Sequence, residues 1–243
     1  QTDRRQGEAM LIAGMLSTFP ALVINSLLFP MGLAAIGITG LAMTEALTVT
    51  VSAPVGEEIC KFLAVLSLRG MIDSSRRGLQ VGFTVGLGFA MLENLQYVLL
   101  SLVAEPTTAA FSYGFTSVIR GIGSIPGHAV WTGLSGYALG CVQAKHAHHV
   151  EKATSSSTTW GLFNAQTGQA FATATSAWVV QRDAWTRRVA SSFGPAPPRV
   201  LLPALLVGIA GHALWNVSTV VLDAWLVDAS AVTQFIAFVG WIF

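Results

Sequence analysis

Residues 79–103, LQVGFTVGLGFAMLENLQYVLLSLV, decide the class of fold. The stretch is long enough to cross a bilayer, because a spanning helix needs about 20 predominantly apolar residues. Glu93 is the one charged residue within it. Glycines at positions 78, 82, 86 and 88 give this helix a small-residue face, which permits a neighbouring helix to approach closely. We therefore predict a membrane-spanning helix whose Glu93 lies in the interior of a bundle and not against lipid.

Other apolar stretches recur along the chain. They run over residues 9–28, 44–68, 119–142 and 200–222, with a shorter one over 229–243. The apolar segment 31–43 leaves three alternatives open: a separate span, a re-entrant piece or the start of the next helix. Of all residues 53% are hydrophobic and 10% are charged, whereas a typical soluble domain is about 25% charged. We therefore predict an all-α, polytopic integral membrane helix bundle with six to seven transmembrane helices and a polar site in its core.

Basic residues between these stretches predict the orientation in the membrane. They occur at positions 4–5, at 69–77 and within the polar segment 145–199, whereas the connections at 105–113 and 223–230 contain no Lys or Arg. Because Lys and Arg favour the cytoplasmic side, we place the N-terminus and the basic loops in the cytoplasm. This placement gives a consistent path with six spans, whereas seven spans would put one basic loop outside.

The whole chain, residues 1–243, is expected to be a single membrane domain. Residues 145–199 form a polar, cytoplasmic insertion within it, with a short helix near residues 173–189. The formal net charge of +1 provides no basic field for binding nucleic acid. Cys60 and Cys141 give neither a disulfide framework nor a metal-binding CxxC pair. Charged residues inside the apolar stretches remain as the candidates for function, because such residues are costly in a bilayer.

The sequence Glu57-Glu58-Ile-Cys-Lys61 places two carboxylates and one ammonium in the second stretch. Lys61 is four residues after Glu57 and three after Glu58, so on a helix it can neighbour either carboxylate. One Glu can then be held ionised by Lys61 while the other serves as a general base. The structural alternative is a neutralised ion pair at the end of a helix.

Three further spans carry polar residues. These are Glu93 with Asn94, Arg120 with His128 eight residues later, and His212 with Asn216 one helical turn later. An imidazole and a carboxamide that project together can position a water molecule or donate to a developing oxyanion. Each group can instead serve as hydrogen-bonded packing between helices. The segments Gly127-His-Ala-Val-Trp131 and Gly211-His-Ala-Leu-Trp215 also echo one another.

Taken together, these motifs resemble those of the PrsW family of intramembrane proteases, a group related to the type II CAAX prenyl endopeptidases. The motifs are Glu57-Glu58-x-x-Lys61, Phe89-x-x-x-Glu93, His128 and His212-x-x-x-Asn216. Where the CAAX enzymes have His in the second motif, this chain has Glu93, as PrsW-like proteins do. The resemblance covers roughly residues 54–217 without the polar insertion. It implies cleavage of a membrane-anchored substrate, such as a transmembrane anti-sigma factor, in a prokaryotic plasma membrane.

The resemblance also implies roles for individual residues. The expected catalytic residues are Glu57, Glu58, Glu93, His128, His212 and Asn216, supported by Lys61, Asn94 and Arg120. Either Glu57 or Glu58 would activate a water molecule, assisted by Lys61 and positioned by Glu93 and His128. His212 and Asn216 would stabilise the oxyanion. The expected partners are a membrane-anchored protein substrate and the lipid bilayer.

A glutamic mechanism without a cofactor is preferred, because Lys61 and Asn216 are not usual metal ligands. The alternative is a Zn²⁺ ion held by Glu93, His128 and His212 together with Glu57 or Glu58. In a different functional class, the chain would be a non-catalytic scaffold for other membrane proteins. A proton or ion transporter would use the same residues as a relay, but no pair of related halves is visible in the sequence.

Overall fold

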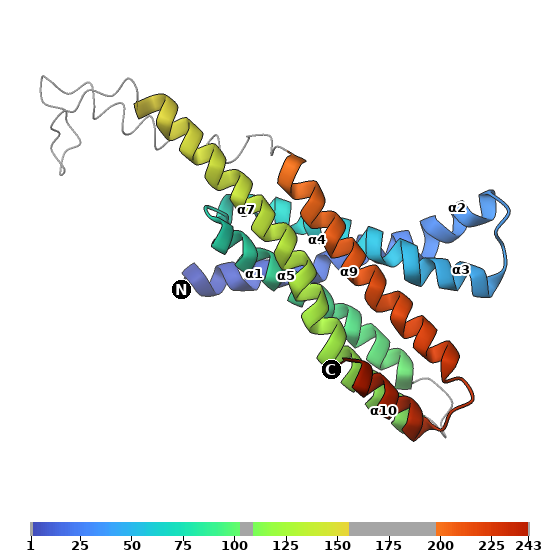
Figure 1. The fold of residues 1–243 in the computed structure, drawn as a ribbon. Coiled ribbons are helices and arrows are strands. Elements are labelled where there is room, and N and C mark those ends of the chain that lie inside the picture. The colour runs from blue at the N-terminus through green and yellow to red at the C-terminus, as the bar shows by residue number, and fades with distance from the viewer. Residues whose placement is uncertain (1, 103–108, 156–197, 243) are drawn as a thin grey trace, which may run out of the picture.

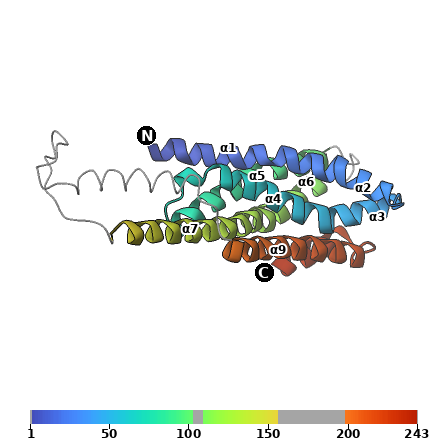
Figure 2. The same ribbon diagram turned by 90° about the horizontal axis from the view of Figure 1, so that it is seen from above.

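The computed structural model describes residues 2–102, 109–155 and 198–242. All regular structure in these residues is helical, which confirms the all-α class. α1 (Thr2–Val23) and α7 (Ile125–Ser155) pack against different faces of α5 (Ser75–Leu102), and α9 (Pro198–Trp225) packs on α7 (Figures 1 and 2). α4 (Ala53–Ser67) contacts each of these helices and so lies in the centre of the bundle.

The N-terminal part forms two long helical rods joined by a turn. The first rod is α1, η1 (Ile24–Leu28) and α2 (Phe29–Ala35), and the second is α3 (Leu41–Leu47), η2 (Thr48–Ser52) and α4 (Ala53–Ser67). Between them Gly37 has a φ of 88°, which glycine adopts without steric cost. The apolar segment 31–43 is therefore the end of one rod, the turn and the start of the next rod, closest to the third alternative.

The remaining helices complete the bundle. η3 (Arg69–Met71) connects α4 to α5, α6 (Ala109–Ile119) continues through η4 (Arg120–Ser124) into α7, and α10 (Ala231–Ile242) follows α9. α7 continues to Ser155, so the first eleven residues of the predicted insertion 145–199 belong to this helix. The short helix expected near residues 173–189 lies outside the described residues.

Three π-helical turns, η1, η2 and η4, each end two residues before a proline. They end at residues 28, 52 and 124, and the prolines follow at positions 30, 54 and 126. A proline within a helix clashes with the carbonyl four residues earlier. The wider π turn moves that carbonyl aside, so each rod continues past its proline. The three turns also carry the polar residues Asn25, Ser52, Arg120 and Ser124.

Glycines determine how closely α5 approaches its neighbours. A Cβ atom on Gly82 would collide with the Thr132 carbonyl of α7, and one on Gly86 would collide with the His128 carbonyl. On another face of α5, a Cβ on Gly88 would collide with the Leu11 carbonyl of α1. These contacts confirm the predicted close approach at the small-residue face, and they bring the backbone of His128 against the helix that carries Glu93.

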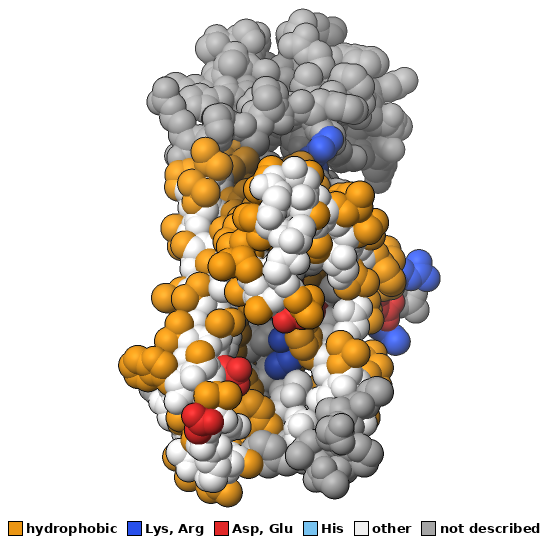
Figure 3. All heavy atoms as spheres, turned by 90° about the vertical axis from the view of Figure 1, so that its right-hand side faces the viewer, with side chains coloured by type: hydrophobic (Ala, Val, Ile, Leu, Met, Phe, Trp, Pro, Cys, Tyr) orange, Lys and Arg blue, Asp and Glu red, His pale blue; other side chains and the backbone are white. Residues whose placement is uncertain are grey.

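The surface of the bundle is largely apolar, as expected for a chain in contact with lipid. Exposed residues such as Leu28, Met31 and Leu206 have more than half of their side-chain surface accessible. Figure 3 shows hydrophobic side chains over most of one face and a basic side chain visible where this face is hollowed.

Three helices of the described part are long and apolar enough to cross a membrane. They comprise residues Arg4–Ala35, Ser75–Leu102 and Val200–Trp225. These helices match the predicted stretches 9–28, 79–103 and 200–222. The total of six to seven spans is not confirmed and stays a prediction.

The basic connections gather at one end of the bundle. The N-terminus of α1, the η3 connection and the start of α9 lie toward one end, and the α2–α3 turn and the α9–α10 connection lie toward the other (Figures 1 and 2). Arg77 at the start of α5 donates to Gln6 Oε1 of α1 at 2.5 Å, which ties two of the basic segments together. The charge asymmetry required by the predicted orientation is thus present in the fold, and the orientation itself remains a prediction.

Candidate active site

Glu57, Glu58 and Lys61 of α4 all lie in the interior of the bundle. Their exposed fractions are 5%, 1% and 0%. Helical spacing allowed Lys61 to pair with either carboxylate, and in the structure its Nζ lies 2.5 Å from Glu58 Oε1. Lys61 Nζ also lies 4.4 Å from the centre of the Phe89 ring. The charge of Glu58 is therefore neutralised within its own helix.

His128 of α7 links Lys61 to Glu93. Its Nδ1 lies 2.7 Å from Lys61 Nζ, and its Nε2 lies 3.0 Å from Glu93 Oε2. An ammonium group can only donate and a carboxylate can only accept. His128 therefore accepts at Nδ1 and donates its Nε2–H to Glu93, and both ring nitrogens are engaged.

Arg120 neutralises Glu93. Its guanidinium donates to Glu93 Oε2 at 2.5 Å and, through Nε, to Asn94 Oδ1 at 2.5 Å. It also reaches Ser124 Oγ at 3.3 Å and lies 3.7 Å from the centre of the Tyr97 ring. The π turn η4 thus supplies both the cation and one of its hydroxyl partners.

His212 of α9 faces both members of the glutamate pair. Its Nδ1 lies 3.2 Å from Glu58 Oε1, and its Nε2 lies 3.8 Å from Glu57 Oε2. Because Nδ1 donates its N–H to the Glu58 carboxylate, the other nitrogen of the neutral ring, Nε2, carries a lone pair. This lone pair is on the side of the ring that faces Glu57.

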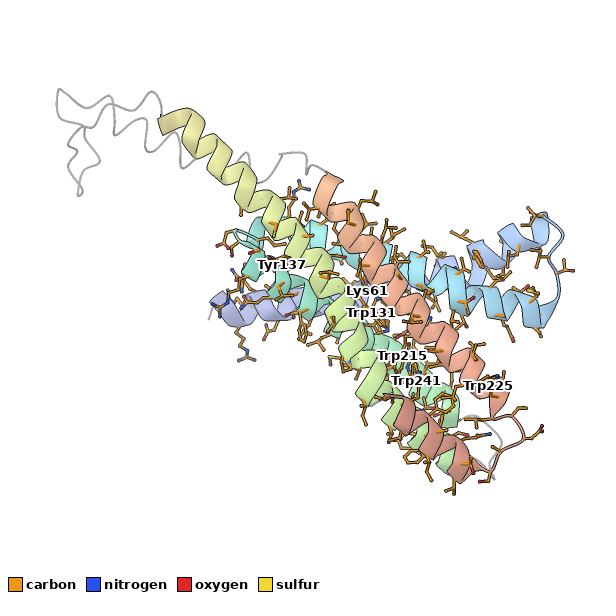
Figure 4. The ribbon with its side chains drawn as sticks, in the orientation of Figure 1. Lys61, Trp131, Tyr137, Trp215, Trp225 and Trp241 are labelled. Carbon is orange, nitrogen blue, oxygen red and sulfur yellow. The ribbon has the colours of Figure 1, made fainter. Side chains whose placement is uncertain are left out.

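The two Gly-His-Ala-x-Trp segments lie against each other, but their tryptophans have different partners. The Trp131 ring of α7 stacks on the His212 ring of α9 with centroids 4.8 Å apart and planes 11° apart. Trp215 of α9 packs against Gly123, before the His128 segment, and its ring lies 4.7 Å from that of Trp241. The rings of His128 and His212 are 4.9 Å apart. Figure 4 shows Lys61 and Trp131 near the middle of the bundle, with Trp215 and Trp241 together further along α9.

Of the three glutamates that the described structure buries, Glu57 is the one with no Lys or Arg in direct contact. Glu58 pairs with Lys61 and Glu93 pairs with Arg120. Glu57 Oε1 instead accepts a 3.3 Å hydrogen bond from Asn25 Nδ2, and its buried Oε2 has no hydrogen-bond partner among the described residues. This oxygen and the Nε2 lone pair of His212 face each other across a gap that a small polar species can bridge.

Asn25 and Ser52 were not identified by the sequence reasoning. Asn25 lies in η1 and Ser52 in η2, and Ser52 Oγ donates to Asn25 Oδ1 at 2.7 Å. A carboxamide inside the apolar stretch 9–28 was the available signal for Asn25. Ser52 offered none, because a single hydroxyl in an apolar helix usually bonds to its own backbone.

Asn216 lies beside the site, and its carboxamide makes one hydrogen bond to the backbone. Its Nδ2 donates to the Val49 carbonyl at 2.8 Å. A carboxamide nitrogen has two protons, so one donor remains after this bond. Asn216 lines the same cavity as Glu57 and His212.

The cavity at this point has a volume of about 280 Å³. Its inner wall is polar and includes Glu57, Glu93, Arg120, His128, His212 and Asn216. Its outer wall is largely apolar and aromatic, with Phe115 of α6, Trp215 of α9 and Phe238 of α10. Glu58 and Lys61 do not line the cavity. They contact two residues that do, since Glu58 contacts His212 and Lys61 contacts His128.

Three of the buried groups have the composition of a metal site. Single ligand atoms of Glu57, His128 and His212 lie within 4.8 Å of one another. A tetrahedral Zn²⁺ site with bonds of about 2.0–2.1 Å holds its ligands roughly 3.4 Å apart, so a modest inward movement would be needed. The orphaned Glu57 Oε2 and the His212 lone pair fit such an ion, whereas His128 would have to exchange a hydrogen bond. Glu93, which the sequence reasoning included in the ligand set, is committed to Arg120 and His128.

The comparison with known families agrees with this geometry. The family described as PrsW family intramembrane metalloprotease matches residues 5–171. The chain belongs to the PrsW family. No curated protein and no solved structure matches the chain. The PrsW match spans Glu57, Glu93 and His128 and ends before His212, and it is the fold that brings His212 and Asn216 of α9 to these three residues. A protein of this family is an intramembrane protease and hence a hydrolase in a membrane environment.

All nine residues predicted for the site converge in the bundle core. Six of them line the cavity, and Lys61, Glu58 and Asn94 lie behind them in contact with them. Their catalytic roles remain predictions.

Proposed function

We propose that this PrsW protein hydrolyses a peptide bond of a membrane-anchored protein with a water molecule activated by Glu57. The observation that carries the proposal is the orphaned Oε2 of Glu57, which is buried and lies 3.8 Å from His212 Nε2. Glu57 lines the cavity and has no cation in contact, whereas Glu58 is held by Lys61 and His212. Of the two adjacent glutamates, Glu57 is therefore the base.

In the proposed reaction, Glu57 Oε2 takes a proton from water and the resulting hydroxide attacks the scissile carbonyl carbon. Donors that line the cavity stabilise the tetrahedral oxyanion. The proposed donor is the N–H of Asn216 that remains after its bond to the Val49 carbonyl. Glu57 then gives its proton to the leaving amine nitrogen as the C–N bond breaks. Atoms and charge balance: one water is consumed, and a carboxylic acid and an amine are formed, which exchange a proton to become carboxylate and ammonium.

Residues around Glu57 hold this arrangement in place. Glu58 orients His212 through Nδ1, and Trp131 stacks on the same ring. In this proposal His212 accepts a hydrogen bond from the water through Nε2 and does not donate to the oxyanion, because its proton is on Nδ1. Arg120 and His128 keep Glu93 ionised and fixed beside the cavity.

A metal ion suits the same group of residues. Glu57, His128 and His212 would hold it, which is the two-nitrogen, one-oxygen donor set of many hydrolytic zinc sites. A bound Zn²⁺ supplies Lewis acidity toward the scissile carbonyl. Glu58 would then orient His212 from behind, the usual role of a carboxylate next to a metal-binding histidine.

The substrate and the location belong to the same proposal. The aromatic outer wall of the cavity suits an apolar peptide segment, and the PrsW resemblance points to a transmembrane anti-sigma factor. In this proposal the basic end of the bundle faces the cytoplasm, and the protein lies in a prokaryotic plasma membrane. Support comes from the basic segments at positions 4–5 and 69–77, which belong to the start of α1 and the connection from α4 to α5 at one end of the bundle (Figure 1).

The test is mass spectrometry of new protein termini in membranes from matched cells. One culture expresses the intact chain, a second Glu57→Gln and a third Glu45→Gln, each at equal level. Glu45 is an exposed carboxylate of α3 outside the site and provides the matched control. New termini beside a transmembrane segment are expected with the intact chain and with Glu45→Gln, and they disappear with Glu57→Gln. Identical termini in all three cultures, with the proteins folded and inserted, would contradict proteolysis and favour a scaffold.

A further inference from the structure

A second cavity lies beside Glu57, away from the aromatic wall. Its volume is about 180 Å³, and it is formed by α1, η1, η2 and α5. Its polar wall consists of Thr18, Asn25, Ser26, Thr48 and Gln96. Glu57 and Glu93 line both cavities, so the two meet at the proposed catalytic carboxylate.

The two cavities are equally polar in their lining but differ in the groups that line them. The first has Phe115, Trp215 and Phe238 in its apolar wall, which suits an apolar peptide. The second also has apolar residues such as Leu22 and Phe89, and its polar groups beside the two glutamates are hydroxyls and carboxamides, which can hold water. A peptide segment seated in the first cavity would exclude solvent there, although hydrolysis consumes one water for each bond broken.

We infer that the second cavity is a water site that supplies Glu57 independently of the substrate cavity. Its volume accommodates several water molecules at about 30 Å³ each. Asn25 lies beside both this cavity and Glu57, because it lines the cavity and donates to Glu57 Oε1. The inference rests on the proposed function in taking water as a reactant, but the presence of water in the cavity can be measured without any cleavage.

Ser26 lines this cavity and is exposed. The rod that carries Ser26 continues over the exposed Leu28 and Met31 to Ala35, so Ser26 lies partway along the rod and not at its end. Labelling from each side of the membrane therefore decides from which side water arrives.

Substituted cysteines in the full-length protein in sealed vesicles test the inference. In a background with Cys60→Ala and Cys141→Ala, Ser26→Cys and Thr48→Cys are exposed to a charged, membrane-impermeant methanethiosulfonate and, separately, to apolar N-phenylmaleimide. Thr39→Cys in the α2–α3 turn and Gly70→Cys in the basic connection mark the two sides. Leu28→Cys, on the apolar surface, is the control for contact with lipid.

The charged reagent is expected to modify Ser26→Cys and Thr48→Cys from one side of the membrane, within about tenfold of the rate at the marker cysteine of that side, and to leave Leu28→Cys unmodified. Adding Ser26→Trp to Thr48→Cys should slow the modification at least tenfold, whereas Ser26→Ala should not. Failure of the charged reagent to modify either site from either side overturns the inference. Loss of proteolysis in the terminus experiment, with labelling intact, would overturn the proposed function and leave the water site standing.

Discussion

The carboxamide of Asn25 donates to Glu57 Oε1 at 3.3 Å, and this bond connects the first helical rod to the proposed base on the second. Ser52 completes the connection by donating to Asn25 Oδ1 at 2.7 Å. Both residues lie in π turns that end two residues before a proline. The bond occupies one oxygen of Glu57, so the other oxygen faces the cavity.

Asn25→Ala is expected to lower kcat about tenfold with KM nearly unchanged. A tenfold change corresponds to about 1.4 kcal/mol, close to the lower limit of about 1.5 kcal/mol for a hydrogen bond to a charged group. The measurement is steady-state cleavage of a peptide identified in the terminus experiment. Because Ser52 acts through Asn25, the double variant with Ser52→Ala should be no slower than Asn25→Ala alone.

Thr50→Ala is the matched control for this pair. Thr50 lies in the same π turn as Ser52, but its hydroxyl donates to the Ala46 carbonyl. Its removal should leave kcat unchanged. Equal losses in Thr50→Ala and Ser52→Ala would show that the hydroxyls matter only for the shape of η2, and the positioning role of Ser52 would be wrong.

Lys61→Met is expected to destabilise the protein strongly. The change leaves Glu58 buried without its cation, and breaking a buried ion pair by removing one partner costs about 3–5 kcal/mol. For a chain of this size the midpoint of thermal unfolding in detergent should fall by roughly 10 °C. Adding Glu58→Gln should recover part of the loss, because no charge then remains unpaired.

The exposed pair Arg4–Glu8 provides the control for Lys61. Arg4 Nε lies 2.9 Å from Glu8 Oε1 with 86% and 53% of the two side chains exposed. Exposed pairs contribute little to stability, so Arg4→Met should not move the midpoint measurably. A midpoint for Lys61→Met equal to that of the intact chain would contradict the burial of this ion pair.

Gly82→Val is expected to disrupt the packing of α5 on α7. Any Cβ at this position meets the backbone of α7, which cannot move aside as a flexible side chain can. Overpacking of this kind costs about 1–3 kcal/mol or prevents the native packing. The measurement is the fraction of monodisperse protein in size-exclusion chromatography after heating.

Gly32→Ala is the control for Gly82→Val, because a Cβ at Gly32 of α2 has no atom within 4 Å. It should behave like the intact chain or be slightly more stable, since alanine favours helix more than glycine does. Normal behaviour of Gly82→Val would contradict the close α5–α7 contact and, with it, the placement of His128 beside Glu93.

Much of the site could be predicted from sequence because charges in apolar helices have few alternatives. Glu93, Arg120 and His128 were each singled out as polar groups inside a span, and the structure joins all three through Glu93 Oε2. Spacing alone did not decide which glutamate pairs with Lys61, because both lie within one helical turn. That choice depends on His212, which is 154 residues away from Glu58.

Other features were hidden because they depend on contacts between rods. Asn25 is uncharged, and its importance appears only when η1 lies against η2 and α4. Each π turn ends two residues before a proline, at position 30, 54 or 126. The sequence shows these prolines, but a proline alone indicates a kink as readily as a widened turn. The segment 31–43 was ambiguous because its apolar composition suits a span, a turn region or a helix start.

Zinc is expected to stabilise the folded protein through the donor set Glu57, His128 and His212. Ligand that binds only the native state raises the unfolding free energy by about 2.7 kcal/mol at a concentration 100 times Kd. After chelation and removal of the chelator, titration with Zn²⁺ should raise the unfolding midpoint of the intact chain. The rise should be lost in His212→Ala and in Glu57→Gln, because each removes one of three ligands.

The histidines at positions 146, 148 and 149 make a control necessary, since they can bind zinc outside the membrane site. A variant with all three changed to Ala should keep the zinc-dependent rise. If the rise disappears in that variant and persists in His212→Ala, the bundle core does not hold zinc and Glu57 activates water without a metal. If the rise follows His212 and Glu57, Glu57 is a zinc ligand and its Oε2 is not free to take a proton from water, so the mechanism with Glu57 as the base would be wrong.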